Sequence, residues 1–111
     1  MTNYCVIDTI HQLRGDTISG FSIDNIKIDE VAIDLANYTV KMQVREKNRR
    51  VILDFTLGDG IIETDSNSIF IEPFIIEKVG VFKYDIQFTN SESEVNTWFA
   101  GDIKITEDIT D

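Results

Sequence analysis

The side chains with the greatest chemical potential in this sequence are one cysteine and one histidine. Cys5 lies in residues 4–7, a run typical of a β-strand, where a free cysteine behaves mainly as a small apolar side chain. His11 lies further along the same predicted strand, residues 4–13, and one histidine with one cysteine is too few for a zinc site. A single cysteine also excludes an intramolecular disulfide. We therefore expect Cys5 to pack in the core and His11 to be a solvated or partly buried strand residue.

Carboxylates are abundant, with 12 Asp among the 20 acidic residues, so chance pairs are expected. A glycosidase pair requires two carboxylates flanking a defined cleft, and nothing in the spacing selects such a pair. The loops at residues 58–60 and 65–68 lack the ligand spacing of an EF-hand and read as turns. Glycine-rich phosphate loops and a nucleophile-elbow motif are not found in the sequence. We expect no enzyme activity, no cofactor and no bound metal.

The overall charge is strongly acidic, because 20 Asp and Glu against 10 Lys and Arg give a net charge of −10. Nucleic acid and anionic membrane surfaces are bound mainly through excess positive charge. We therefore expect no bulk nucleic-acid binding and no membrane binding. The longest apolar stretches are about four residues, against the roughly 20 that span a bilayer. Residues 1–4 do not resemble a signal peptide, so we expect synthesis and folding in a cytoplasm.

Half of the basic residues fall within one ten-residue span, which leaves 5 basic and 19 acidic side chains elsewhere. One interpretation is a solvated hairpin whose cations pair across strands with Asp54 or Glu46. The other is a docking patch for an acidic surface on another subunit, including another copy of this protein, which implies head-to-tail assembly. Trp98 and Phe99 are adjacent on the last strand, so alternation places one of them on the exposed side. The candidate interface residues are Lys41, Arg45, Lys47, Arg49, Arg50 and Trp98.

The aliphatic composition indicates an all-β fold. The chain has 18 Ile and 8 Val against 4 Leu and 3 Ala, and branching at Cβ favours strands. Apolar and polar side chains alternate most clearly in residues 38–45, 51–57 and 82–89. Less regular strands are expected at residues 4–13, 19–28, 69–71 and 95–106. Seven short strands with short connections predict one domain over residues 1–111, an antiparallel β-sandwich, with a closed barrel as the alternative.

Two connections between these strands carry specific predictions. Residues 47–50 are short and polar, and they predict a hairpin turn between the third and fourth strands. Residues 74–79 follow the single proline and end at Gly80. Proline near the start and glycine just past the end are typical of a helix. We therefore predict one short helical turn near residues 74–79 that crosses between the sheets.

Several of these segments together resemble a family of phage proteins. They are Gly15-Asp16-Thr17, the Lys-Met-Gln-Val-Arg strand within residues 38–45, the Tyr-Asp-Ile-Gln strand within residues 80–89, and residues 95–97 leading to residues 101–105. The pattern is similar to the Ig-like β-sandwich at the N-terminus of phage baseplate upper proteins and in short stand-alone phage virion proteins. The resemblance runs from residue 13 to residue 110.

The resemblance implies an Ig-like fold and a structural role without enzyme activity. The function expected from it is that of a structural or adaptor protein of a bacteriophage particle, at the baseplate or tail, as a head decoration or at fibre attachment. The expected partners are other virion proteins and copies of the chain itself, and the expected location is the virion, after synthesis in the host bacterial cytoplasm. The alternative function is a ligand-binding module for a host-surface carbohydrate or peptide.

Overall fold

The regular structure consists almost entirely of β-strands, as the Ile and Val content predicted. The computed structural model describes residues 5–28 and 30–107, and its one helical element there is a 3-10 turn, η1 (Leu35–Asn37). The strands are β1 (Cys5–Val6), β2 (Ile10–Leu13), β3 (Thr17–Ile18), β4 (Phe21–Ile23), β5 (Lys27–Ile28), β6 (Val31–Ala32), β7 (Tyr38–Arg45), β8 (Val51–Leu57), β9 (Gly60–Asp65), β10 (Ser68–Ile71), β11 (Phe74–Ile75), β12 (Gly80–Asn90) and β13 (Val95–Thr106).

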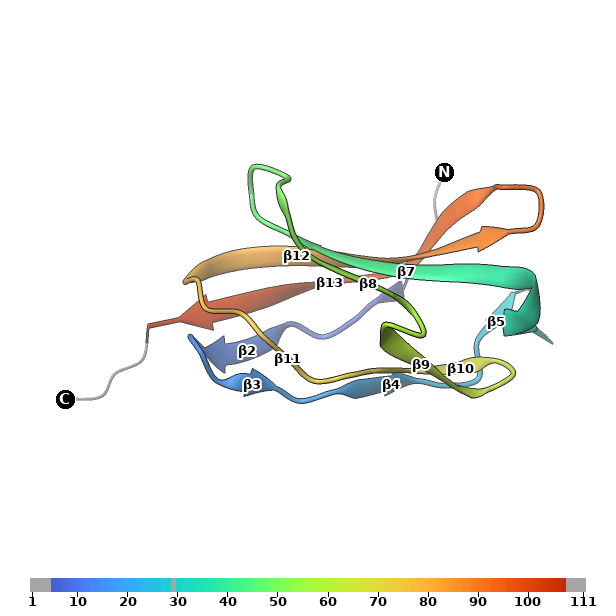
Figure 1. The fold of residues 1–111 in the computed structure, drawn as a ribbon, viewed down its shortest axis with the longest axis horizontal. Helices are drawn as coiled ribbons and strands as arrows, with labels where there is room; N and C mark the ends of the chain where they lie inside the picture. The colour runs from blue at the N-terminus through green and yellow to red at the C-terminus, as the bar shows by residue number, and fades with distance from the viewer. Residues whose placement is uncertain (1–4, 29, 108–111) are drawn as a thin grey trace.

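The strands form two facing layers (Figure 1). In one layer β1 and β2 lie beside β13, followed by β12, β7 and β8. In the other layer β9, β10 and β4 are neighbours, and β3 with β11 extends them. The chain passes between the layers at Gly58 and Gly60, whose φ angles of 95° and 94° lie in the left-handed region that favours glycine. This strand order is that of an Ig-like sandwich, so the predicted fold class is confirmed.

Most neighbouring strands are antiparallel, as their short connections predicted. The main exceptions are β1 and β2, which run parallel to β13. Nearly the whole chain separates them from β13, so no short turn dictates their direction. A two-residue parallel contact between β8 and β9 marks the passage between the layers. The path of paired strands begins at β1 and ends at β4. These two strands do not pair with each other within the described residues, so the fold is an open sandwich and not a closed barrel.

The strands outnumber the seven predicted partly because one long ladder is interrupted. β4 pairs with β10, and β3 pairs with β11, in a single continuous antiparallel register. That register places Ser19 opposite Pro73 and Gly20 opposite Glu72. Pro73 has no N–H group to donate, so the ladder breaks at this point. No strand is predicted at β9, because apolar and polar side chains do not alternate in residues 60–65; the structure fully buries Ile61 alone among them.

The helical turn predicted near residues 74–79 is wrong. Phe74 and Ile75 form β11 and pair with Ile18 and Thr17 of β3. Burial in this segment alternates with a period of two, since Phe74 is buried, Ile75 exposed and Ile76 buried again. Proline is tolerated next to a short strand as well as at a helix start. The need to cover the core with alternate side chains therefore outweighs the local proline–glycine pattern.

The core lies between the two layers and uses the side chains that alternation predicted. Val40, Met42 and Val44 of β7 are completely buried, and Phe82, Tyr84, Ile86 and Phe88 of β12 face the same space. Facing them from the second layer are the buried aliphatics Ile18, Ile61, Ile69 and Ile71. The polar side chains that alternate with these buried residues along β7 and β12 therefore lie on the outer face of the first layer.

Gly20 is required by a close approach within the interrupted ladder. A Cβ at this position would lie 2.5 Å from the carbonyl oxygen of Ile71, and closer still to the ring of Phe70. Because a backbone atom is involved, the clash cannot be relieved by rotating one side chain. We expect Gly20→Ala to lower the free energy of unfolding in urea by about 1–3 kcal/mol. The neighbouring exposed change Ser19→Ala should stay within about 0.5 kcal/mol of the wild type, and equal stability of the two variants would contradict this account.

Candidate functional site

A cluster of exposed positive charge lies in the turn between β7 and β8, which we call the basic turn (residues 46–50). The N–H of Arg49 donates to the carbonyl of Glu46 at 2.9 Å, and the N–H of Glu46 donates to the carbonyl of Arg50 at 2.9 Å. Arg49 has a φ of 71°, and Asn48 Oδ1 accepts from the N–H of Arg50 at 3.0 Å. These bonds confirm the predicted hairpin connection. They fix a turn whose three cations, Lys47, Arg49 and Arg50, are all exposed.

The five candidate basic residues do not form one patch. Lys41 lies on the outer face of β7 and forms an ion pair with Asp54 of β8 at 4.0 Å, which is one of the two pairings that the sequence predicted. Arg45 lies four residues further along β7, on the same face of the strand. Glu46 pairs instead with Lys78, whose hydrogen bond lowers the pKa of Glu46. The cations available to a partner at the turn are therefore Lys47, Arg49 and Arg50, which make no ion pair with any described residue.

Trp98 and Phe99 are oriented by a β-bulge. The register between β12 and β13 shifts so that Trp98 has no opposite residue, and both rings turn toward the core. The Trp98 ring stacks on buried Phe88 with centroids 4.3 Å apart, and the Phe99 ring lies 6.2 Å from the same Phe88. The expectation that strict alternation would expose one of the pair is therefore wrong. Trp98 also lies 5.3 Å from Tyr38, at the opposite end of β7 from the basic turn.

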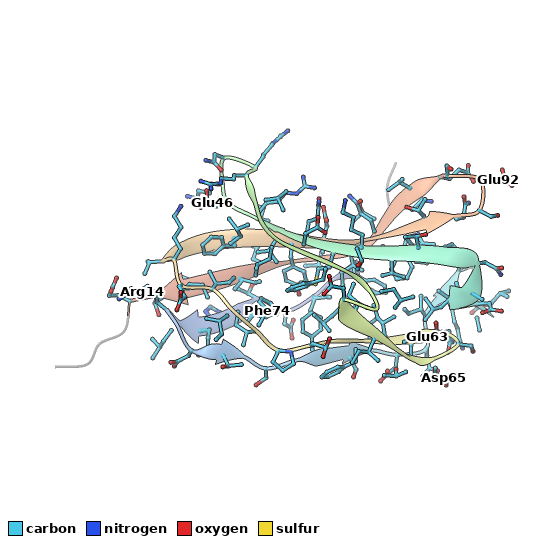
Figure 2. All side chains as sticks on the ribbon, viewed as in Figure 1. Arg14, Glu46, Glu63, Asp65, Phe74 and Glu92 are labelled. Atoms are coloured by element: carbon cyan, nitrogen blue, oxygen red, sulfur yellow. The ribbon has the colours of Figure 1, made fainter. Side chains whose placement is uncertain are left out.

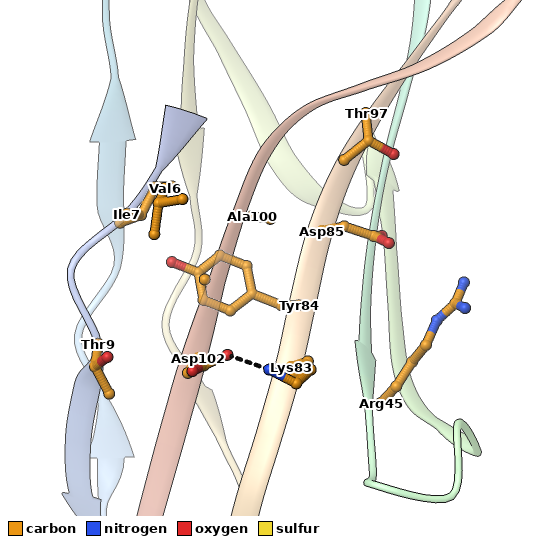
Figure 3. Close-up of a pocket in the computed structure, with 11 residues that line it drawn as sticks. Val6, Ile7, Thr9, Arg45, Lys83, Tyr84, Asp85, Thr97, Ala100 and Asp102 are labelled. Atoms are coloured by element: carbon orange, nitrogen blue, oxygen red, sulfur yellow. Dashed lines mark hydrogen bonds and ion pairs between the residues drawn. The ribbon is translucent and has the colours of Figure 1, made fainter. Parts of the chain in front are cut away.

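A hollow of about 560 Å³ lies beside β13 and the segment between β1 and β2 (Figure 3). Three buried polar atoms of residues that line it have no hydrogen-bond partner among the described residues: Arg45 Nε, Tyr84 Oη and Asp85 Oδ1. The Tyr84 ring lies across Gly101, where a Cβ would come within 2.7 Å of Oη. Burial, together with the charge of Asp102, raises the pKa of Tyr84 to about 12. The phenol is therefore protonated near neutral pH and available as a donor.

Burial raises the pKa of Asp85 above its ordinary value of 3.8, and the nearby Arg45 only partly opposes this. Because the folded state then binds the proton more tightly than the unfolded state, ionisation of Asp85 destabilises the fold as the pH rises through the folded pKa. We therefore compare the free energy of unfolding of Asp85→Asn with that of the wild type. We expect this difference to favour the variant more at pH 7 than at pH 3.5. Urea unfolding of both proteins at the two pH values checks this, and a stability difference that does not change with pH would contradict it.

Acidic side chains gather at the end of the sandwich opposite the basic turn, which we call the acidic end (residues 24–28, 30–37, 63–67 and 91–94). Figure 2 shows Glu63, Asp65 and Glu92 at this end, far from Glu46 of the basic turn. The described residues of the acidic end carry seven carboxylates and one cation, Lys27. Sequence reasoning missed this cluster, because its members come from three separate loops. Assigning each loop to one end of the predicted sandwich would have found it.

Comparison with models of protein families and with curated proteins found no match. Among solved structures, the chain is similar to CopC from Methylosinus trichosporium OB3b, with a TM-score of 0.48 and 6% identity over 91% of this chain and 89% of that one. It is also similar to extracellular domains 3–5 of Drosophila OTK, with a TM-score of 0.47 and 13% identity over 94% of this chain. It spans 34% of that OTK chain. The Ig-like assignment made above stands on the strand order.

Of the two residues first considered for chemistry, the structure describes the side chain of His11 alone. His11 is exposed on β2, where it lies opposite Lys104 of β13. The predicted packing of the Cys5 side chain falls outside what the structure describes. Within residues 5–28 and 30–107, no three His, Cys, Asp or Glu side chains are placed to hold a metal ion. The described residues include no helix long and apolar enough to cross a membrane.

Proposed function

We propose that this chain is a non-enzymatic structural or adaptor protein of a bacteriophage particle, which acts through contacts with other virion proteins and with copies of itself. The phage part of the proposal rests on the segments within residues 13–110 that resemble phage virion proteins. The observation that carries the assembly part is the basic turn. It presents three exposed cations, fixed by backbone hydrogen bonds, on a chain whose net charge is −10.

The surroundings of the basic turn are suited to a protein partner. Beside it lies a hollow of about 370 Å³ lined by the apolar residues Ile52, Leu53, Ile75 and Ile76. Two cations, Arg50 and Lys78, and two carboxylates, Glu46 and Glu77, line the same hollow. We call the basic turn together with residues 75–81 the basic end. An apolar centre bordered by charged groups is the usual composition of a protein–protein contact, and opposite charge on a partner accelerates and orients docking.

Deletion of the gene from the phage or prophage that carries it tests the proposal. We expect particles that lack a tail, baseplate, fibre or decoration component under negative-stain electron microscopy, with infectivity restored by the wild-type gene in trans. Intact and fully infective particles from the deletion strain would overturn the proposed role.

The hollow lined by Arg45, Tyr84 and Asp85 favours one second candidate function, binding of a polar ligand such as a host-surface carbohydrate or peptide. On the outer face Arg45 Nε and Asp85 Oδ1 offer one donor and one acceptor, whereas Tyr84 Oη points the other way, toward the core (Figure 3). Trp98 argues against carbohydrate binding, because its ring is stacked on Phe88 and is not presented to a sugar. A glycan-array screen tests this candidate. Binding that Asp85→Asn abolishes would support it, and an array without signal would remove the carbohydrate version.

A further inference from the structure

We propose that copies of this chain associate end to end, with the acidic end of one copy docked on the basic end of the next. The inference rests on the proposed assembly role and names the partner of the basic turn as a second copy. An apolar surface lies at the acidic end of the molecule. It is formed by the small hairpin of β5 and β6 and by the groove beside it.

The β5–β6 hairpin is firmly anchored but leaves apolar side chains in solvent. Ile26 and Ile33 flank it and are buried, and the N–H of Ile33 donates to the carbonyl of Ile26 at 3.1 Å. Between these anchors Val31 is 68% exposed and Ile28 is 39% exposed. A hollow of about 540 Å³ extends from them to Tyr38 and the β12–β13 turn. Exposed apolar side chains that gather on one element indicate a contact surface.

The basic end, together with the adjoining start of β8, also exposes apolar side chains, as the β5–β6 hairpin does at the acidic end. Ile75, Val79, Val81 and Val51 are each between 37% and 46% exposed there. The hollow of about 370 Å³ described above lies among Ile52, Leu53, Ile75 and Ile76 and opens beside Arg50. It can receive the side chains of Ile28 and Val31 from the hairpin of another copy.

Charge decides the orientation of this contact and favours a second copy as the occupant. The acidic end carries seven carboxylates and one cation, whereas residues 46–50 and 75–81 of the basic end carry four cations and two carboxylates. Copies with a net charge of −10 repel each other in most orientations. The end-to-end orientation alone places the cluster of cations against the cluster of carboxylates. One chain therefore contains both halves of a complementary pair.

The two ends are too far apart to meet within one chain. β7 runs from Tyr38 at the acidic end to Arg45 at the basic turn, and the molecule extends 51 × 28 × 22 Å. A contact between different surfaces on two copies is heterologous, so it continues into a chain of molecules or closes as a ring. A 28 × 22 Å end buries less than the roughly 800 Å² per partner of a standard interface. We therefore expect weak, salt-sensitive association.

Two charge-reversal variants and their mixture test the inference by sedimentation velocity over a series of protein concentrations. The turn variant is Arg49→Glu with Arg50→Glu, and the loop variant is Glu30→Lys with Glu92→Lys. All four side chains are exposed. Lys104→Glu with Thr56→Glu and Ser22→Glu is the matched control for the turn variant, because it changes the net charge equally on exposed sheet positions that make no ion pair within the described residues. Circular dichroism establishes that each variant is folded.

We expect the sedimentation coefficient of the wild type and of the control to rise with concentration, and to rise less in 500 mM salt than in 50 mM salt. Each reversal variant alone should associate at least tenfold more weakly, and an equimolar mixture should regain association, because each variant retains the end that the other needs. A wild type that stays monomeric, or a mixture that associates no better than its components, would overturn the inference. A wild type that stays monomeric yet is incorporated into particles would overturn this inference and leave the proposed role intact.

Discussion

Replacing Phe88 by alanine is expected to lower the free energy of unfolding by about 3–5 kcal/mol, a large part of the about 5–15 kcal/mol that stabilises an ordinary domain. Phe88 is completely buried on β12. Its ring stacks on Trp98 at 4.3 Å and makes an edge contact with Tyr38 at 6.3 Å. These contacts join β12 to β7 and β13, so the cavity left by alanine would lie where three strands meet. Urea unfolding followed by the fluorescence of Trp98 measures the loss.

Two further variants keep this prediction testable if Phe88→Ala does not fold. Phe88→Leu retains most of the apolar volume and should lose less stability than the alanine variant. Val95→Ala removes an exposed side chain from the neighbouring β13 and should change stability by no more than about 0.5 kcal/mol. If Phe88→Leu or Phe88→Ala is as stable as the wild type, the aromatic cluster is not the centre of this end of the core.

Reversing the charge at the tip of the basic turn should remove the chain from the particle without unfolding it. Arg49→Glu with Arg50→Glu replaces two exposed cations, so the melting temperature should remain close to that of the wild type. Like charges brought together in an interface cost several kcal/mol, and 1.4 kcal/mol corresponds to a factor of ten in affinity. We therefore expect the amount of the variant in purified particles to fall at least tenfold. Immunoblots of particles from complemented deletion strains measure it.

Arg45 is left out of this variant on purpose, although it belongs to the same basic span of the sequence. It lies beside Asp85, and a carboxylate there would face an aspartate whose pKa burial already raises. The loss of incorporation could then reflect a destabilised fold. Lys104→Glu with Thr56→Glu and Ser22→Glu again serves as the control of equal charge and should be incorporated normally. Normal incorporation of the turn variant would show that the basic turn does not hold the chain in the particle.

The fold could be predicted where the burial requirement repeats along the chain. Residues 38–45 and 82–89 alternate strictly, and the structure buries Val40, Met42 and Val44 and exposes or half-buries the residues between them. Such a pattern is a direct consequence of a strand with one face on a core. The high content of Ile and Val points to the same fold class. These signals are local, so they can be read without knowing which strands are neighbours.

The errors arose where distant parts of the chain decide the local structure. Proline followed by glycine predicted a helical turn near residues 74–79, but pairing of β11 with β3 makes this segment a strand. Strict alternation predicted that Trp98 or Phe99 is exposed, but a bulge opposite β12 turns both rings inward. Neither the partner strand nor the bulge is visible in the local sequence. Phe74, Ile75 and Ile76 are all apolar, so the alternating burial of this segment appears only in the folded structure.

Of the two ends of the candidate site, only the basic turn could be predicted from the sequence. The basic turn is continuous along the chain, so a count of charges over residues 41–50 locates it. The acidic end is assembled from three loops, and it becomes visible only when the sandwich brings Glu30, Asp65 and Glu92 to one end. The same geometry separates Lys41 from the turn, because its ion pair with Asp54 lies on the outer face of β7 and β8.

Chemical cross-linking of purified particles tests most directly whether the chain acts by assembly through its basic turn. An amine-reactive cross-linker followed by mass spectrometry reports which lysines lie beside another subunit. We predict that Lys47 is linked to a lysine of another virion protein or to Lys27 of another copy, a pair that lies at opposite ends within one chain. Absence of the chain from the particles, or links to other subunits from Lys104 and none from Lys47, would contradict the account.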